Sequence, residues 1–192
     1  TALRQLYLHG PLNGDIPATL SQLTELRELS ILNNYLYHNE TIHTGNLSGI
    51  LPQDIGNLVH LESLAIYNAL EGTLPPSIGN LSNLKVMRFY QDTTWFGKGK
   101  LSGLLPEEIG NLHSLEQLHI NDHMLSGPLP DGFREMTALT QVDLGGNQLS
   151  GSIPVLNHPN IQYLQLGYNL FTGIEEGAAS CPALVDMQLQ GN

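Results

Sequence analysis

The chain of 192 residues contains one cysteine and one tryptophan, and it has few basic residues, 7 Lys and Arg against 18 Asp and Glu. A single cysteine excludes an internal disulfide framework. No apolar run approaches the length of about 20 residues that crosses a membrane, so this segment has no membrane span. Residues 101–192 hold ten acidic side chains and one basic side chain, Arg134. Nucleic-acid binding is disfavoured because it requires a basic track that neutralises phosphates.

The chain contains a leucine-rich sequence pattern that repeats along its whole length. The pattern Leu-x-x-Leu-x-Leu recurs, with isoleucine or valine in some units, and it starts at Leu3, Leu26, Leu61, Leu84, Leu115, Leu139, Ile161 and Leu184. Most spacings are 22 to 24 residues, and the two long ones predict insertions near 35–45 and 92–100. A fixed period of this size is typical of solenoids. The sequence therefore predicts one domain, 1–192, of about eight repeats.

Each repeat contains two further signals. The alternation in Leu-x-Leu predicts a short strand with one buried face, and a Gly-x-Leu-Pro type of turn follows it, as at Gly103-Leu104-Leu105-Pro106. The ninth position favours asparagine, whose buried amide can bind the backbone of neighbouring turns. This ladder comprises Asn34, Asn147, Asn169 and Asn192, with His123 in place of asparagine in the fifth repeat.

The string Asn147-Gln148-Leu149-Ser150-Gly151-Ser152-Ile153-Pro154 and the recurring Ile-Gly-Asn-Leu at 55–58, 78–81 and 109–112 carry a resemblance. They resemble the plant-type leucine-rich repeats of receptor-like kinases, receptor-like proteins and polygalacturonase inhibitors, along the whole chain. The resemblance implies an α/β repeat solenoid, a curved rod with a parallel β-sheet on the concave face and short 3-10 turns and loops on the convex face. It also implies an extracellular protein.

Neither end of the chain carries a cap. Solenoids need polar capping repeats, and relatives usually carry paired cysteines in theirs. We therefore expect a segment of a longer protein, with neighbouring domains or subunits covering the ends. The lone Cys181 aligns with core leucines, so we expect a buried, inert thiol.

Three N-glycosylation sequons support a secreted or ectodomain location. They begin at Asn39, Asn46 and Asn80. The repeat consensus itself supplies Asn-Leu-Ser, so chance is the alternative explanation.

Ligand binding in such a fold is expected on the strand positions that point out of the concave face. The predicted ligand-binding residues are Tyr67, Arg88, Tyr90, Trp95, Lys98, His119 and Asn121. Five of these should form one exposed patch on three consecutive strands, and Trp95 and Lys98 belong to the second insertion. Two alternatives stay open: tyrosine is also a favourable strand surface residue, and Trp95 can fold back to pack its own loop.

Catalytic and metal sites are not predicted, and no cofactor is expected. His119 and His123 have the spacing of helical metal ligands, but one is expected on a strand and the other in the ladder. The paired carboxylates at 107–108 and 175–176 should lie in solvent. Two functions remain: a recognition module for a peptide, protein or glycan, or a structural and adhesive scaffold or filament component. An enzyme is not expected.

Overall fold

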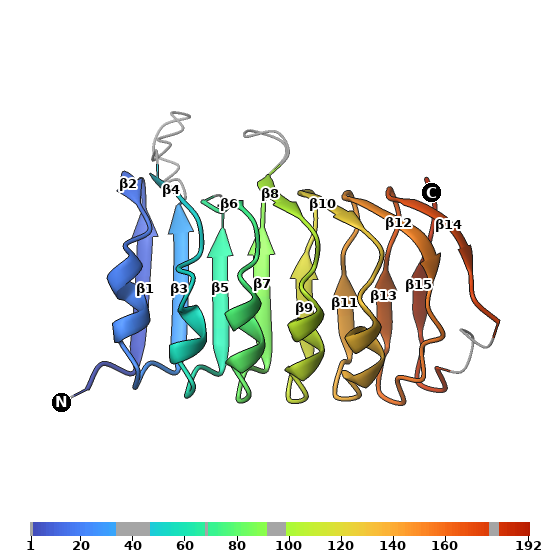
Figure 1. The fold of residues 1–192 in the computed structure, drawn as a ribbon, viewed down its shortest axis with the longest axis horizontal. Helices are drawn as coiled ribbons and strands as arrows, with labels where there is room; N and C mark the ends of the chain where they lie inside the picture. Colours follow the sequence, from blue (N-terminus) through green and yellow to red (C-terminus); the bar gives the residue numbers. More distant parts are fainter. Residues whose placement is uncertain (1, 34–46, 68, 92–98, 177–180) are drawn as a thin grey trace.

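The computed structural model describes residues 2–33, 47–67, 69–91, 99–176 and 181–192. Eight parallel strands stand side by side along the long axis (Figure 1). They are β1 (Gln5–Gly10), β3 (Glu28–Asn33), β5 (Ser63–Tyr67), β7 (Val86–Tyr90), β9 (Gln117–Ile120), β11 (Gln141–Asp143), β13 (Tyr163–Gln165) and β15 (Asp186–Gln188). Each strand begins two residues after a predicted repeat start. The predicted parallel solenoid is therefore the observed fold.

A second parallel sheet follows the turns that leave the first. Its strands are β14 (Leu170–Ile174), β12 (Gln148–Ile153), β10 (Met124–Gly127), β8 (Lys100–Gly103) and β6 (Glu71–Gly72), and β2 (Gly14–Asp15) pairs with β4 (Leu47–Ser48). The strands β8 and β10 each end on a glycine, Gly103 and Gly127, with φ of +77° and +76°. Glycine is required there because other residues rarely adopt a positive φ.

Short 3-10 helices close the repeats on the side away from the eight-stranded sheet. They are η1 (Ala18–Gln22), η2 (Ile55–Asn57), η3 (Pro76–Asn80), η4 (Glu107–Asn111) and η5 (Asp131–Glu135). Their glycines allow close stacking, since a Cβ on Gly79 would lie 2.2 Å from the Glu108 carbonyl oxygen. None of the described helices is long and apolar enough to cross a membrane. We call the sheet face turned away from these helices the concave face.

Alternation along the strands separates the core from the concave face. In β5 and β9 every second residue is fully buried, and the residues between them are half-buried. Phe89 and Phe133 have no exposed surface, and Phe171 is 7% exposed, so all three lie in the core as predicted. Cys181 is also buried, and its thiol lies 3.3 Å from the Leu156 carbonyl oxygen. The burial of this thiol agrees with the expectation from the sequence.

The asparagine ladder connects successive repeats. The Asn147 Oδ1 accepts the Leu125 amide at 3.0 Å, and its Nδ2 donates to the Ile120 carbonyl at 2.7 Å. Asn169 makes the same kind of contacts one repeat later, with Leu149 N–H at 2.9 Å. The predicted member Asn34 lies outside the described residues.

The second and fifth repeats show how the ladder varies. Asn33, one residue before the predicted position, is buried and donates to the Leu47 carbonyl at 3.1 Å. In the fifth repeat His123 occupies the predicted position, and its Nδ1 accepts the Leu101 amide at 3.3 Å. The histidine thus replaces an asparagine oxygen with a ring nitrogen.

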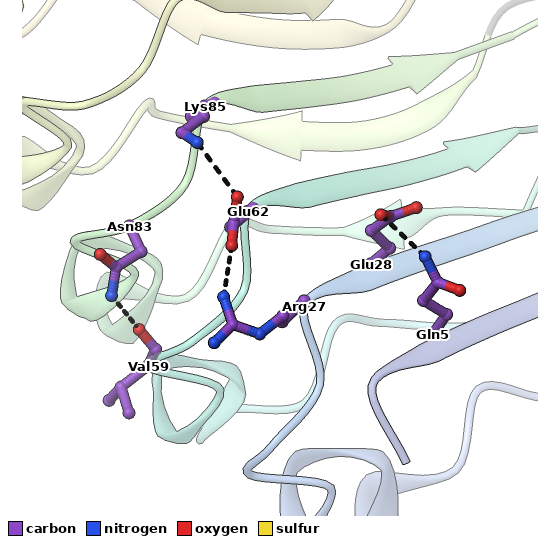
Figure 2. A network of polar contacts seen from close by, with 7 residues as sticks. All are labelled: Gln5, Arg27, Glu28, Val59, Glu62, Asn83 and Lys85. Carbon is purple, nitrogen blue, oxygen red and sulfur yellow. Dashed lines mark hydrogen bonds and ion pairs between the residues drawn. The ribbon is translucent and has the colours of Figure 1, made fainter.

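Polar side chains line the edge of the eight-stranded sheet at which the strands begin (Figure 2). Glu62 accepts from the Arg27 Nη1 at 2.6 Å and from the Lys85 Nζ at 3.0 Å, so one carboxylate joins three repeats. Hydrogen bonds from Lys85, and then from Arg27, lower the pKa of the Glu62 carboxyl. Because this edge is exposed to solvent, each of these ion pairs contributes little to stability.

The second predicted insertion ends earlier than expected. Lys100 begins β8, and its Nζ lies 3.6 Å from the Glu71 carboxylate. The preceding Gly99 donates its backbone N–H to the Asp122 carbonyl at 2.8 Å. Residues 99 and 100 therefore belong to the solenoid.

Candidate functional site

Five predicted ligand-binding residues lie on or beside three neighbouring strands. The register pairs Tyr67 of β5 with Tyr90 of β7, and Arg88 of β7 with His119 of β9. Asn121 follows β9 directly. The side chains share the concave face because alternate residues of a strand point to the same side. The predicted juxtaposition is present in the structure.

Their exposure differs from the expectation. Tyr90 is 44% exposed, whereas Tyr67, Arg88, His119 and Asn121 are half-buried. The patch is less exposed than predicted because neighbouring side chains of adjacent strands cover one another. The rings of Tyr67 and Tyr90 lie 5.9 Å apart, centroid to centroid, and Arg88 donates from Nη2 to the Gln117 Oε1 at 2.5 Å. We call these five residues the tyrosine-arginine patch.

The electrostatics of the patch centre on one cation. Burial, and then the positive charge of Arg88, lower the pKa of His119, whereas a hydrogen bond between its ring and the Gln141 side chain raises it. The lowered pKa favours the neutral form of the His119 ring. The guanidinium of Arg88 supplies the positive charge of the patch. The Nε of Arg88 is buried, and no hydrogen-bond partner for it lies among the described residues. A buried donor left without a partner favours a ligand or water that accepts from it.

Several predicted site residues lie outside the described residues. They are Trp95 and Lys98 of the second insertion and the sequon residues Asn39 and Asn46. The third sequon residue, Asn80, is exposed at the end of η3, on the side opposite the tyrosine-arginine patch. Glycosylation at Asn80 stays a prediction.

The histidines that have metal-ligand spacing occupy different environments. His119 lies on β9, whereas His123 is buried in the ladder, where burial lowers its pKa to about 4. Across the described residues, no group of three or more His, Cys, Asp or Glu side chains is arranged to hold a metal ion.

A hollow lies beside the patch, toward the C-terminal end of the concave face. Its volume is about 480 Å³, and Asn121 at its rim connects it to the patch. The other lining side chains include Asp122, Asp143, Gln165, Tyr168 and Gln188. The sequence did not lead us to predict this hollow. The available signal was Gly145 and Gly167, which occupy the repeat position that Tyr67 and Tyr90 fill elsewhere.

Comparison with known proteins decides the family. A model described as a leucine-rich repeat region matches residues 42–144, which is more than half of the chain. The chain belongs to the leucine-rich-repeat family. No curated protein matches it significantly.

Several solved leucine-rich-repeat structures are similar to the chain. The ectodomain of the Arabidopsis thaliana membrane receptor kinase GASSHO1/SCHENGEN3, solved with CASPARIAN STRIP INTEGRITY FACTOR 2, is 31% identical over 88% of this chain, with a TM-score of 0.72. The Arabidopsis receptor kinase HAESA, solved with the peptide hormone IDA and the co-receptor SERK1, is 29% identical over 88% of this chain, with a TM-score of 0.69. This chain spans 19% of the first protein and 26% of the second.

A bacterial structure shows that the leucine-rich-repeat fold extends beyond plant receptors. The leucine-rich-repeat protein LIC12759 of Leptospira interrogans matches 99% of this chain and 43% of its own length, with a TM-score of 0.74. Its identity is 23%, so this likeness concerns the fold alone.

Proposed function

We propose that the chain is an extracellular recognition module, without enzymatic activity, whose concave face binds a peptide or protein segment. The observation that carries this proposal is the tyrosine-arginine patch, where a tyrosine pair adjoins a half-buried arginine whose Nε has no hydrogen-bond partner among the described residues. Tyrosine and arginine are enriched among residues that dominate binding energies. The HAESA structure, which is similar to the chain, was solved with a peptide hormone, and this supports the same class of ligand.

The chemistry of the patch favours a ligand with a carboxylate. The guanidinium of Arg88 can bind a carboxylate through two parallel N–H donors, and the rings of Tyr67 and Tyr90 can cover an apolar group beside it. Neutral His119 adds a hydrogen-bonding group without competing for the anion. We propose that Lys98 and Trp95 of the second insertion contribute to the binding of the same ligand.

Binding to synthetic peptides tests this proposal. The protein is titrated calorimetrically against a set of peptides with free carboxylates and, in parallel, against oligosaccharides with uronic acid groups. Arg88→Ala and Tyr90→Ala should each weaken peptide binding by about 2 kcal/mol, a roughly thirtyfold rise in Kd. Arg134→Ala on η5 is the control, because it removes a basic side chain from the opposite side.

The outcomes of this titration are distinct. Peptide binding that the two substitutions weaken and the control does not would support the proposal. Unchanged binding by a folded Arg88→Ala, Tyr90→Ala double variant would place the site elsewhere. Tight binding of the oligosaccharides alone would replace the peptide with an acidic glycan.

A specific observation favours the second function, a structural or adhesive scaffold. Apolar side chains follow the turn glycines of several repeats, and Ile50, Leu104 and Ile174 are 52%, 62% and 50% exposed. The side chain of Leu104 lies over Gly127 of the next repeat, since a Cβ on Gly127 would meet the Leu104 Cδ2 at 2.4 Å. We call Ile50, Thr73, Leu104 and Pro128 the flank row. Exposed apolar rows of this kind mark protein contacts.

A further inference from the structure

The hollow beside the tyrosine-arginine patch has a structural origin in two glycines. The seventh repeat position carries Tyr67 in β5 and Tyr90 in β7, but Gly145 and Gly167 follow β11 and β13 at the same position. With no side chains there, a space of about 480 Å³ opens between the strand ends and the Tyr168 side chain. The backbone that lines the hollow is hydrogen-bonded between repeats, and the Gly146 N–H donates to the Gly167 carbonyl at 3.0 Å.

The polar groups around this hollow are mostly acceptors. Asp122 and Asp143 line it together with four residues that have amide side chains, Asn121, Gln165, Gln188 and Gln190. No lining residue is basic. Among the described residues, all four ion pairs lie elsewhere, so neither aspartate has a cationic partner there. Each aspartate instead accepts a neutral donor, Asn121 Nδ2 at 3.0 Å and Gly145 N–H at 3.1 Å.

The arrangement is electrostatically incomplete without a cation. Burial raises the pKa of Asp143, and the negative charge of Asp122 raises it further, although the Gly145 amide lowers it. A cation in the hollow would neutralise both carboxylates. The Tyr168 side chain lines the same space, and its ring can pack against a guanidinium.

The concave face has a cationic group, Arg88, at one end of the site and the acidic hollow at the other. The strand register places Arg88, His119 and Asp143 in one row across β7, β9 and β11. Because neighbouring strands lie about 4.8 Å apart, the cationic and anionic ends of this row are about 10 Å apart. An extended peptide rises about 3.3 Å per residue, so about three residues span that distance.

We propose that the hollow binds the guanidinium of a ligand arginine, at about three residues from the acidic group that Arg88 binds, so that the concave face selects a peptide with both charges at this spacing. The spacing rests on the proposed function, whereas the cation site itself does not. Arginine is favoured over lysine because a planar guanidinium pairs with two carboxylates and amide oxygens at once and stacks on tyrosine.

The first experiment tests the cation site alone. N-acetyl-arginine amide is titrated into the isotope-labelled protein, and amide shifts are followed by NMR. The shifts of Gly145, Gly146 and Gly167 should respond, and Asp143→Asn and Asp122→Asn should each weaken the apparent affinity about tenfold. The control variant Asp54→Asn removes an exposed carboxylate far from the hollow, beside η2, and should bind as the unsubstituted protein does.

The second experiment tests the spacing. Peptides with one glutamate and one arginine, separated by one, three or six positions, are compared with versions in which alanine replaces the arginine. The spacing of three should bind best, and replacing its arginine should cost about tenfold in Kd in the unsubstituted protein but little in Asp143→Asn.

The outcomes separate the two proposals. Suppose that Arg88→Ala abolishes peptide binding, that neither aspartate substitution has an effect, and that N-acetyl-arginine amide produces no response. This result would overturn the cation site and leave the proposed function intact. A response to N-acetyl-arginine amide in a protein that binds none of the peptides overturns the proposed function and the spacing but keeps the cation site. Equal affinity for the peptides of all three spacings would overturn the proposed selection of a three-residue distance.

Discussion

At the scale of single residues, His123 shows how a substitution in the ladder is accommodated. Its neutral ring accepts the Leu101 amide through Nδ1, as an asparagine oxygen does in the neighbouring repeats. Room for the larger ring comes from Gly99, where an added Cβ would lie 2.0 Å from Nδ1. Protonation of Nδ1 would destroy the acceptor, and burial lowers the pKa of the ring to about 4.

This lowered pKa makes the stability sensitive to acid. Because the folded protein binds the proton on His123 less readily than the unfolded chain, its contribution is complete above pH 6.5 and is lost as the pH falls toward 4. The free energy of unfolding should therefore fall by up to about 1.4 kcal/mol per pH unit in this window. His123→Asn should reduce that slope, measured by urea unfolding at several pH values.

His113→Asn, at an exposed position, serves as the control for this measurement. Part of the slope will remain in His123→Asn, since burial also lowers the pKa of His119 and His158. The same pH dependence in His123→Asn as in the unsubstituted protein would show that the ladder histidine is not an acid-sensitive group.

At the scale of elements, the 3-10 helices depend on glycine for their stacking. The Gly110 of η4 faces Gly132 of η5, and a Cβ on Gly110 would lie 2.5 Å from the Gly132 Cα. Backbone atoms cannot move aside as a flexible side chain can. The repeat distance on this side of the solenoid is therefore set by the absence of a side chain.

Gly110→Ala should lower the free energy of unfolding by about 1–3 kcal/mol, the usual cost of overpacking. Gly173→Ala is the matched control, because its added Cβ would meet no atom within 4 Å. The stability of both variants is measured by thermal and urea unfolding, with circular dichroism as the signal. An equal, small effect of the two substitutions would contradict the close-stacking argument.

At the scale of the whole molecule, the flank row and the concave face offer two separate surfaces. If the scaffold function holds, the flank row mediates self-association. Ile50→Ser with Leu104→Ser should then shift the protein toward monomer in sedimentation experiments and leave its unfolding midpoint nearly unchanged, since both side chains are exposed. Val59→Ser, also at an exposed apolar position, is the control. Association that persists in the double variant would exclude the flank row as the contact.

Sequence alone was sufficient for the repeat, its register and the division between core and concave face. The reason is physical: each repeat buries the same leucine positions, so a linear pattern is converted directly into a stack. For that reason the eight strand positions and the pairing of Arg88 with His119 followed from counting. The position of His123 in the ladder followed in the same way, whereas its hydrogen bond from the Leu101 amide came only from the structure.

The tertiary structure decided what depends on how neighbouring side chains fill space. The burial of Arg88 and His119, the inclusion of Lys100 in β8 and the burial of Asn33 each depend on contacts across repeats. The hollow near Asp143 is the clearest case. Two glycines in a sequence say that side chains are missing, but only the stacked strands show that the missing volumes adjoin and that two carboxylates border them.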